Sequence, residues 1–87
     1  MKDVDKIIER IIEGEDLTVS CSMYEEIIYY IDGKFMSSFE NGIQSVTNER
    51  SENYVRNSIV DALNDTDYYG MYIGDEDLTG EEEDLGD

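Results

Sequence analysis

The sequence has no histidine and a single cysteine, Cys21, and both scarcities bear on catalysis. Histidine is the commonest general acid or base, and no base stands beside the cysteine to activate it as a nucleophile. The glycines are scattered, each with a turn explanation, so there is no glycine-rich phosphate loop. Paired carboxylates are abundant, but they catalyse reactions only inside a concave pocket, for which so small a domain has little room. We therefore expect no enzyme, no catalytic residue and no cofactor.

The lone cysteine and the lack of long apolar runs also bear on where the protein works. One cysteine excludes an internal disulfide and fits a reducing compartment. Its place in an alternating segment predicts a buried thiol that packs as a small apolar side chain. The N-terminus reaches acidic residues by Asp3 without the apolar stretch of a signal peptide. No run approaches the roughly 20 apolar residues of a transmembrane helix, so we expect a cytoplasmic protein.

Positive charge is scarce, and the last basic residue is Arg56. The chain has 6 basic and 23 acidic residues, for a formal net charge of −17. This charge repels the phosphates of DNA, RNA and anionic membranes, so we expect none of these as a direct ligand. It favours a basic protein partner or a cation; the alternative is that it serves only to prevent aggregation. The acidic residues beyond Arg56 are Asp61, Asp65, Asp67, Asp75, Glu76, Asp77, Glu81, Glu82, Glu83, Asp84 and Asp87.

Two segments have the periodicity of amphipathic helices. The first covers residues 3–13, with its first residue as N-cap and Gly14 as its end. The second covers residues 51–64, capped by Asn48 or Ser51. The apolar stripes are Val4, Ile7, Ile8, Ile11 and Ile12 in the first helix, and Val55, Ile59, Ala62 and Leu63 in the second.

Three segments between the helices have the pattern of strands. Residues 16–23 alternate between apolar and polar side chains, and residues 25–31 are rich in β-branched and aromatic ones. Asp32-Gly33 is a strong signal for a two-residue hairpin turn, which leads into a strand over 34–39. Residues 40–50 are predicted to be a polar connection. The predicted fold is therefore α+β, with the order helix, three-stranded antiparallel sheet, helix.

The hairpin register makes both faces of this sheet apolar. A two-residue turn pairs Ile31 with Lys34 and, in step, Tyr30 with Phe35. An apolar sheet face left in water is unfavourable, so we expect a cover on the side away from the helices. The cover would be the C-terminal aromatic segment or a second copy of the chain, and we expect a homodimer. The two faces are Ile28, Tyr30, Phe35 and Phe39 on one side, and Ile27, Tyr29, Ile31 and Met36 on the other.

The C-terminal third is expected to carry the binding site. Residues 68–73 form a short strand or a hook, which closes a domain over residues 1–73 and is followed by a flexible acidic tail over 74–87. The carboxylates would lie on one end of the domain, with the later ones on a flexible arm. Tyrosines among them either dock onto the core or supply amphipathic contact area at an interface. The predicted partner-binding residues are Asp61, Asp65, Asp67, Tyr68, Tyr69, Asp75, Glu76 and Asp77, with Glu81, Glu82, Glu83 and Asp84 on the arm.

A calcium loop is the alternative interpretation of this segment. Asp65, Asp67, Gly70 and Glu76 match four positions of an EF-hand loop, and a predicted helix precedes them. Tyr69 stands where that loop has another oxygen ligand, and the exiting segment has no helical stripe. We therefore predict no metal site, and the calcium question stays open at this point.

The charge pattern itself suggests mimicry of a nucleic-acid backbone. B-DNA presents about one negative charge per 1.7 Å of its axis, and the sites that bind it are lined with lysine and arginine. A compact protein with rows of carboxylates can occupy such a site, helped by counterion release and fast electrostatic steering.

In size, charge and order of elements the chain resembles small acidic phage-encoded inhibitors that act as DNA mimics. The resemblance covers the two predicted helices, the strands around Asp32-Gly33 and the acid-rich end. It includes the phage inhibitor of the nucleoid protein HU and the small anti-CRISPR proteins that block the DNA-binding groove of Cas9. It implies host takeover in the bacterial cytoplasm by binding a basic DNA-binding protein. We favour HU, because a homodimer would match its two-fold symmetry. The alternatives are Cas9 and, as for an immunity protein, a basic nuclease.

Overall fold

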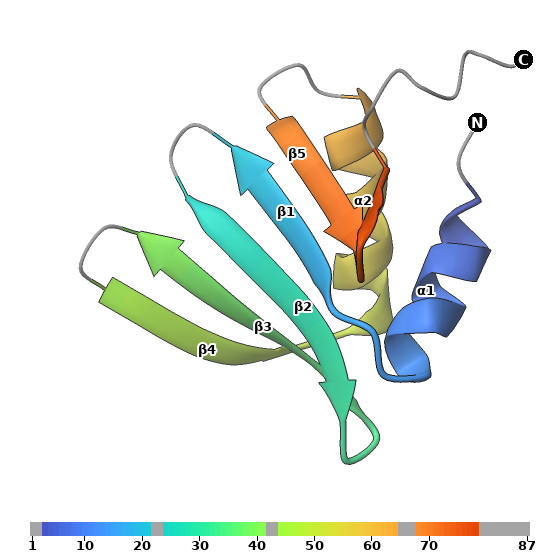
Figure 1. Cartoon of the computed structure of the whole chain (residues 1–87). Helices are drawn as coiled ribbons and strands as arrows, with labels where there is room; N and C mark the ends of the chain where they lie inside the picture. The colour runs from blue at the N-terminus through green and yellow to red at the C-terminus, as the bar shows by residue number, and fades with distance from the viewer. Residues whose placement is uncertain (1–2, 22–23, 42–43, 65–67, 79–87) are drawn as a thin grey trace, which may run out of the picture.

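The computed structural model describes residues 3–21, 24–41, 44–64 and 68–78 of the chain. It is an α+β fold in which strands pair into one antiparallel sheet and two helices pack beside it (Figure 1). No helix in these ranges is long and apolar enough to cross a membrane. In chain order the elements are α1 (Val4–Ile12), β1 (Leu17–Cys21), β2 (Glu25–Ile31), β3 (Lys34–Asn41), β4 (Gln44–Arg50), α2 (Glu52–Asn64), β5 (Tyr68–Ile73) and β6 (Glu76–Asp77).

The sheet has six strands in the order β4-β3-β2-β1-β5-β6, so the predicted three-stranded sheet is wrong in strand number. The first four strands form a meander. The chain then crosses one face of the sheet as α2 and returns as β5, antiparallel to β1. This crossover makes β1 a central strand between β2 and β5. Of the two alternatives predicted for residues 68–73, a short strand or a hook, the strand is confirmed, and it lies within the sheet.

The segment predicted to be a polar connection contains β4, which pairs with β3 from Phe35↔Arg50 to Asn41↔Gln44. Its pattern was weak because β4 is an edge strand whose side chains are mostly polar, with Val46 as its only aliphatic residue. An edge strand is bonded on one side and need not bury an apolar row. Pairing with β3 therefore decides its conformation more than its own composition does.

The helices begin and end where local signals place them. The Asp3 side chain caps α1 by accepting a hydrogen bond from the backbone N–H of Asp5, and Ser51 caps α2 by accepting one from Tyr54. Gly14, at φ 120°, follows the last turn of α1. The predicted apolar stripes are largely buried. Ile12 is the exception at 45% exposed, because its position is rotated by about 80° from that of Val4 around the helix.

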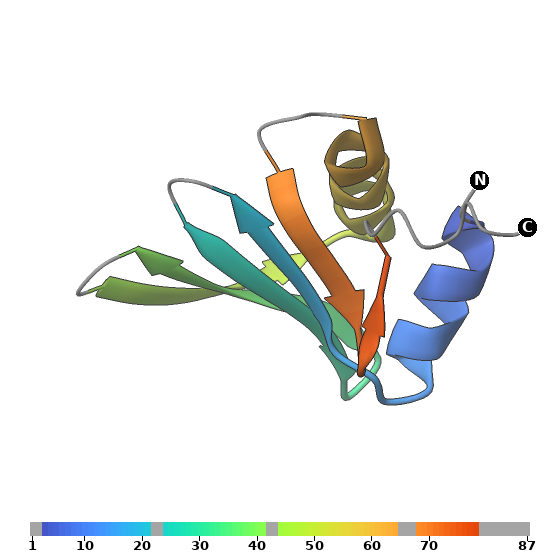
Figure 2. The ribbon, with the colours of Figure 1, turned by 45° about the horizontal axis from the view of Figure 1, so that its top comes forward.

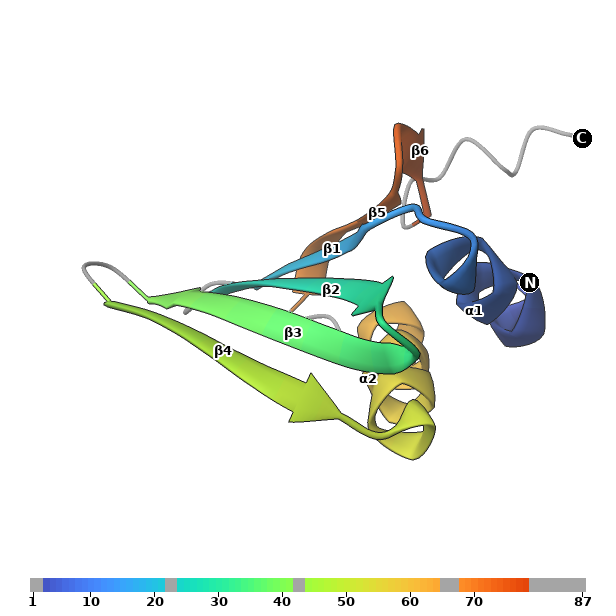
Figure 3. The ribbon, with the colours of Figure 1, turned by 90° about the horizontal axis from the view of Figure 1, so that it is seen from below.

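The hairpin register and the division of the two sheet faces are confirmed. Ile31 pairs with Lys34 and Tyr29 with Met36, and the turn residue Asp32 has φ 55°. Both helices lie on one side of the sheet (Figures 2 and 3), where they cover Ile28 and its neighbours. The core on that side consists of Ile7, Ile8, Ile11, Leu17, Val19, Ile28, Phe35, Val55, Ile59, Ala62, Met71, Ile73 and Leu78.

The folded domain extends beyond the expected boundary at Ile73. Glu76 and Asp77 pair with β5 as β6, and the backbone N–H of Leu78 donates a 2.7 Å hydrogen bond to the carbonyl of Met71. The Leu78 side chain is 4% exposed and belongs to the core. The first part of the predicted flexible tail is therefore folded, whereas residues 79–87 lie outside the described ranges.

We predict that Leu78→Ala lowers the free energy of unfolding by about 2–3 kcal/mol, because it removes buried methyl groups and leaves a cavity. Ile12→Ala is the matched control, since Ile12 is 45% exposed, and its effect should stay within about 0.5 kcal/mol. Urea unfolding followed by circular dichroism measures both. Equal effects of the two substitutions would contradict the placement of Leu78 in the core.

Candidate functional site

The described acidic candidates fall into two groups at opposite ends of β5. Asp61 is exposed near the C-terminal end of α2, which leads into β5, while Asp75, Glu76 and Asp77 follow its other end. Six strand residues at about 3.3 Å each separate the two groups by roughly 20 Å. The expectation that these carboxylates share one end of the domain is therefore wrong for the described ones, because the full length of β5 separates Asp61 from Asp75, Glu76 and Asp77.

The structure describes only the backbone of two of the remaining candidates and does not describe the others. Asp65, Asp67 and Glu81 through Asp84 lie outside the described residues. Tyr68 and Tyr69 are placed as backbone at the start of β5.

The conformation of β5 contradicts the calcium-loop interpretation. Gly70 and its neighbours, which would form the middle of a cation-binding loop, pair with β1 as an extended strand. Glu76 follows the far end of that strand from Tyr68, and its carboxylate contacts Arg10. Extended backbone of this kind cannot wrap a cation as the EF-hand loop does.

Three acidic residues, 75–77, lie in the turn between β5 and β6 and in β6 itself. We call residues 74–77 the acidic hairpin. Gly74 has φ 57°, and its N–H donates to the carbonyl of Asp16 at 3.0 Å. A Cβ at Gly74 would lie 2.5 Å from Oε1 of Glu15 and would displace that carboxylate, and the positive φ also favours glycine here. The hairpin is thus held against the α1–β1 connection, which is itself acidic.

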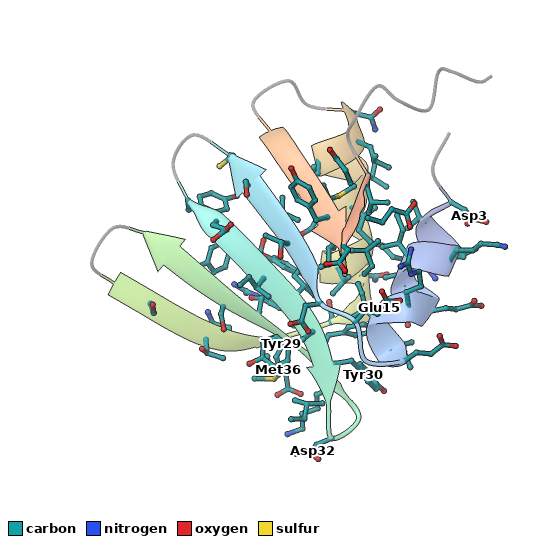
Figure 4. All side chains as sticks on the ribbon, in the orientation of Figure 1. Asp3, Glu15, Tyr29, Tyr30, Asp32 and Met36 are labelled. Atoms are coloured by element: carbon teal, nitrogen blue, oxygen red, sulfur yellow. The ribbon has the colours of Figure 1, made fainter. Side chains whose placement is uncertain are left out.

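Arg10 joins these two acidic segments. Its Nε donates to Oε2 of Glu15 at 2.7 Å and its Nη2 donates to Oε1 of the same carboxylate at 2.8 Å. Its Nη1 donates to Glu76 in the acidic hairpin. The bidentate hydrogen bonds from Arg10 lower the pKa of Glu15 below its ordinary value, and both glutamates raise the pKa of Arg10. Figure 4 labels Glu15 at the start of β1, facing α1.

Arg56 repeats the same arrangement on the helix pair. Its Nη1 lies 2.6 Å from a carboxylate oxygen of Asp5, and its Nη2 lies 3.0 Å from Glu52. Each of these two arginines is thus shared by two carboxylates, and every such cluster keeps a net negative charge. Arg10 and Arg56 therefore fix acidic side chains in place without cancelling the negative field around them.

A buried carboxylate was missed at the sequence level. Glu26 on β2 is 3% exposed, and its Oε2 accepts a 2.8 Å hydrogen bond from the hydroxyl of Tyr54 on α2. Burial, and then the hydrogen bond to Glu26, raise the pKa of Tyr54 to about 12. The guanidinium of Arg50 lies 4.3 Å from the centre of the Tyr54 ring and donates to Ser37 at 3.0 Å. The burial of Glu26 could have been predicted from its position, because alternation along β2 places Glu26 on the same sheet face as Ile28.

The side of the sheet away from the helices carries a second group of candidate residues. We call it the open face; its apolar side chains are Ile27, Tyr29, Ile31, Met36 and Tyr72. Figure 4 shows Tyr29 and Met36 next to each other on adjacent strands. The expectation that the aromatic C-terminal segment covers this face is wrong, because that segment joins the sheet as β5. Within the described residues both helices pack on the opposite side.

Comparison of the chain with protein-family models, with curated proteins and with solved structures finds no match.

The Arg10 contacts predict a local pH effect. Because the pKa of Glu15 is lower in the folded state, the contact contributes stability above the ordinary glutamate pKa of about 4.3, and that contribution is lost as the pH falls through the lowered value. In Arg10→Gln the pKa of Glu15 should rise toward its ordinary value. Carboxyl-detected NMR titration measures it. Arg56→Gln is the matched control, and an equal rise of the Glu15 pKa in that variant would refute a specific contact.

The buried pair predicts a stability effect. Tyr54→Phe removes the hydroxyl that hydrogen-bonds Glu26 and leaves a buried carboxylate oxygen without that donor. We expect a loss of about 1–3 kcal/mol in the free energy of unfolding. Tyr72→Phe, at a tyrosine that is 41% exposed, should change the value by less than about 0.5 kcal/mol. Thermal and urea unfolding of the two variants provide the comparison; similar losses would show that the Tyr54 hydroxyl has no special role.

Proposed function

We propose that this chain is a DNA-mimic inhibitor that binds the basic DNA-binding surface of a host protein and excludes DNA from it. One observation carries the proposal: thirteen of the fifteen acidic side chains whose exposure the structure describes are exposed. The same ranges contain five basic side chains, and two of these are each shared by two carboxylates. A folded surface with this excess of fixed negative charge is what a site lined with lysine and arginine attracts.

The way the carboxylates are held supports binding that is more than diffuse attraction. Arg10 fixes Glu15 and Glu76, while the backbone of the acidic hairpin is fixed by β-pairing and by the core position of Leu78. Side chains and backbone that are ordered before binding lose less conformational entropy when a partner engages them. The described carboxylates are therefore better suited to a specific interface than charges on an unstructured chain of equal charge.

For the partner we propose the nucleoid protein HU first, on the resemblance to phage-encoded DNA mimics. Cas9 blocked at its DNA-binding groove, and a basic nuclease blocked as by an immunity protein, are the alternatives. All three present lysine- and arginine-rich surfaces to nucleic acid, so the charge pattern alone does not rank them. Direct binding measurements with purified candidates separate the three.

We predict saturable binding to purified HU dimer that weakens by at least an order of magnitude between about 50 and 200 mM salt, because phosphate-like contacts release counterions. Duplex DNA should compete with the chain for HU. Fluorescence anisotropy with labelled chain measures both effects, with guide-loaded Cas9 and a basic nuclease assayed in parallel. An affinity independent of salt, or a ternary complex that retains DNA, would refute DNA mimicry. Binding to one of the other targets alone would reassign the partner.

A further inference from the structure

We propose that the open face is the surface on which the basic partner docks, with its apolar side chains as the centre of the interface and acidic side chains as the rim. The inference rests on the proposed function, since it assumes a basic partner. It assigns that partner a surface centred on the sheet, with the acidic hairpin at one edge of it. Figures 2 and 3 show that the helices leave this side of the sheet uncovered.

The centre of the open face is apolar and accessible. Ile31 is 53% exposed and Tyr72 is 41% exposed, while Ile27 and Tyr29 on β2 and Met36 on β3 are partly exposed. Tyr72 and Ile27 both register with Thr18 on β1, which places the two side chains about 10 Å apart across the sheet. Aromatic and aliphatic side chains clustered in this way are typical of the energetic centre of a protein interface.

The rim of this face is predominantly acidic. Glu25 shares the face beyond Ile27, and Glu49 pairs with Met36 from the edge strand. Asp77 pairs with Tyr72, so the acidic hairpin continues the surface at the other edge of the sheet. Lys34, opposite Ile31, is the basic side chain of this face among the described residues. Three exposed carboxylates against one lysine make the rim complementary to a basic partner.

The same rim argues against a second copy of the chain as the occupant. The apolar centre measures about 14 Å across three strand spacings and about 13 Å along β2, or roughly 200 Å². A stable interface buries about 800 Å² on each partner, so most of the contact must come from the rim. Two copies face to face would bring acidic rims together, each on a chain of net charge −17. With a basic partner the acidic rim would face positive charges, and the electrostatic interaction across the interface would be attractive.

The side chains of the centre also suit a basic surface. Lysine and arginine carry long aliphatic stems that pack on apolar groups while their charged ends reach outward. The rings of Tyr29 and Tyr72 can accept such stems or a guanidinium on their faces, and the rim carboxylates then meet the charged ends. The partner predicted by this chemistry is a protein surface rich in lysine and arginine with an apolar residue at its middle.

Three threonine substitutions test the inference, since threonine retains strand propensity. Ile31→Thr and Tyr72→Thr remove exposed side chains from the open face. Val46→Thr is the matched control: Val46 is 49% exposed on the same sheet, but it pairs with Phe39 and so lies on the opposite face. Amide NMR spectra of the free variants confirm that each remains folded. The probes are purified HU dimer, guide-loaded Cas9 and a basic nuclease, measured by surface plasmon resonance at several salt concentrations.

We expect Ile31→Thr and Tyr72→Thr to weaken binding about tenfold or more, chiefly through faster dissociation, with the salt dependence unchanged. Val46→Thr should bind as wild type does. If wild type binds a probe and all three variants bind equally well, the open face is not the docking surface, although the proposed function stands. If wild type binds none of the probes, both fail. If wild type dimerises and Ile31→Thr and Tyr72→Thr alone abolish the dimer, the face belongs to a second copy and the inference is overturned.

Discussion

The packing of α1 and α2 against one face of the sheet is the contact on which the other features depend. Ile7, Ile8 and Ile11 from the first helix and Val55 and Ile59 from the second meet the same layer of strand side chains. Because α2 crosses that face, the chain returns beside β1 and completes a sheet with β1 at its interior. Within the described residues neither helix covers the opposite face. One hydrophobic contact thus determines which surface of this small domain is free to bind.

The charge of the domain is organised by that fold. A net charge of −17 on 87 residues opposes compaction through self-repulsion. Two arginines on the helices reduce this repulsion locally. Arg10 joins α1 to the acidic hairpin, and Arg56 joins the two helices through Asp5. Both contacts connect elements that are distant in sequence and belong to the same domain. Arg10 and Arg56 therefore act as connectors, and the acidic excess remains at the surface.

The sequence predicted the helices, the β2–β3 register and the content of the two sheet faces, because periodicity, caps and the Asp32-Gly33 turn are local signals. It did not predict β4, whose partner across the sheet specifies it, nor the in-sheet position of β5. Leu78 was overlooked because an isolated apolar residue in an acidic segment has no periodic neighbours. These errors share one cause: strand pairing between distant segments leaves little trace in the composition of either segment.

The candidate site was predicted less well than the fold. The sequence located the acidic residues but not their separation, since β5 places Asp61 and Asp75 at opposite ends of a strand. Glu26 was missed because a carboxylate on a core-facing position is recognised only when its partner, Tyr54, is known. The open face, in contrast, follows from the hairpin register alone. What the structure adds is that both helices pack on the other side of the sheet and that β5 lies within the sheet.

The unequal edges of the sheet have a consequence for how copies of the chain behave at high concentration. One edge, β6, is two residues long and acidic, whereas the other, β4, is seven residues long, lacks proline and has a described strand partner on one side only, β3. A long unblocked edge is a template for polymerisation by strand addition. In this chain electrostatic repulsion between copies opposes that assembly. The acidic surface would therefore oppose fibre formation as well as attract the proposed basic partner, and a variant with its carboxylates neutralised would lose both properties together.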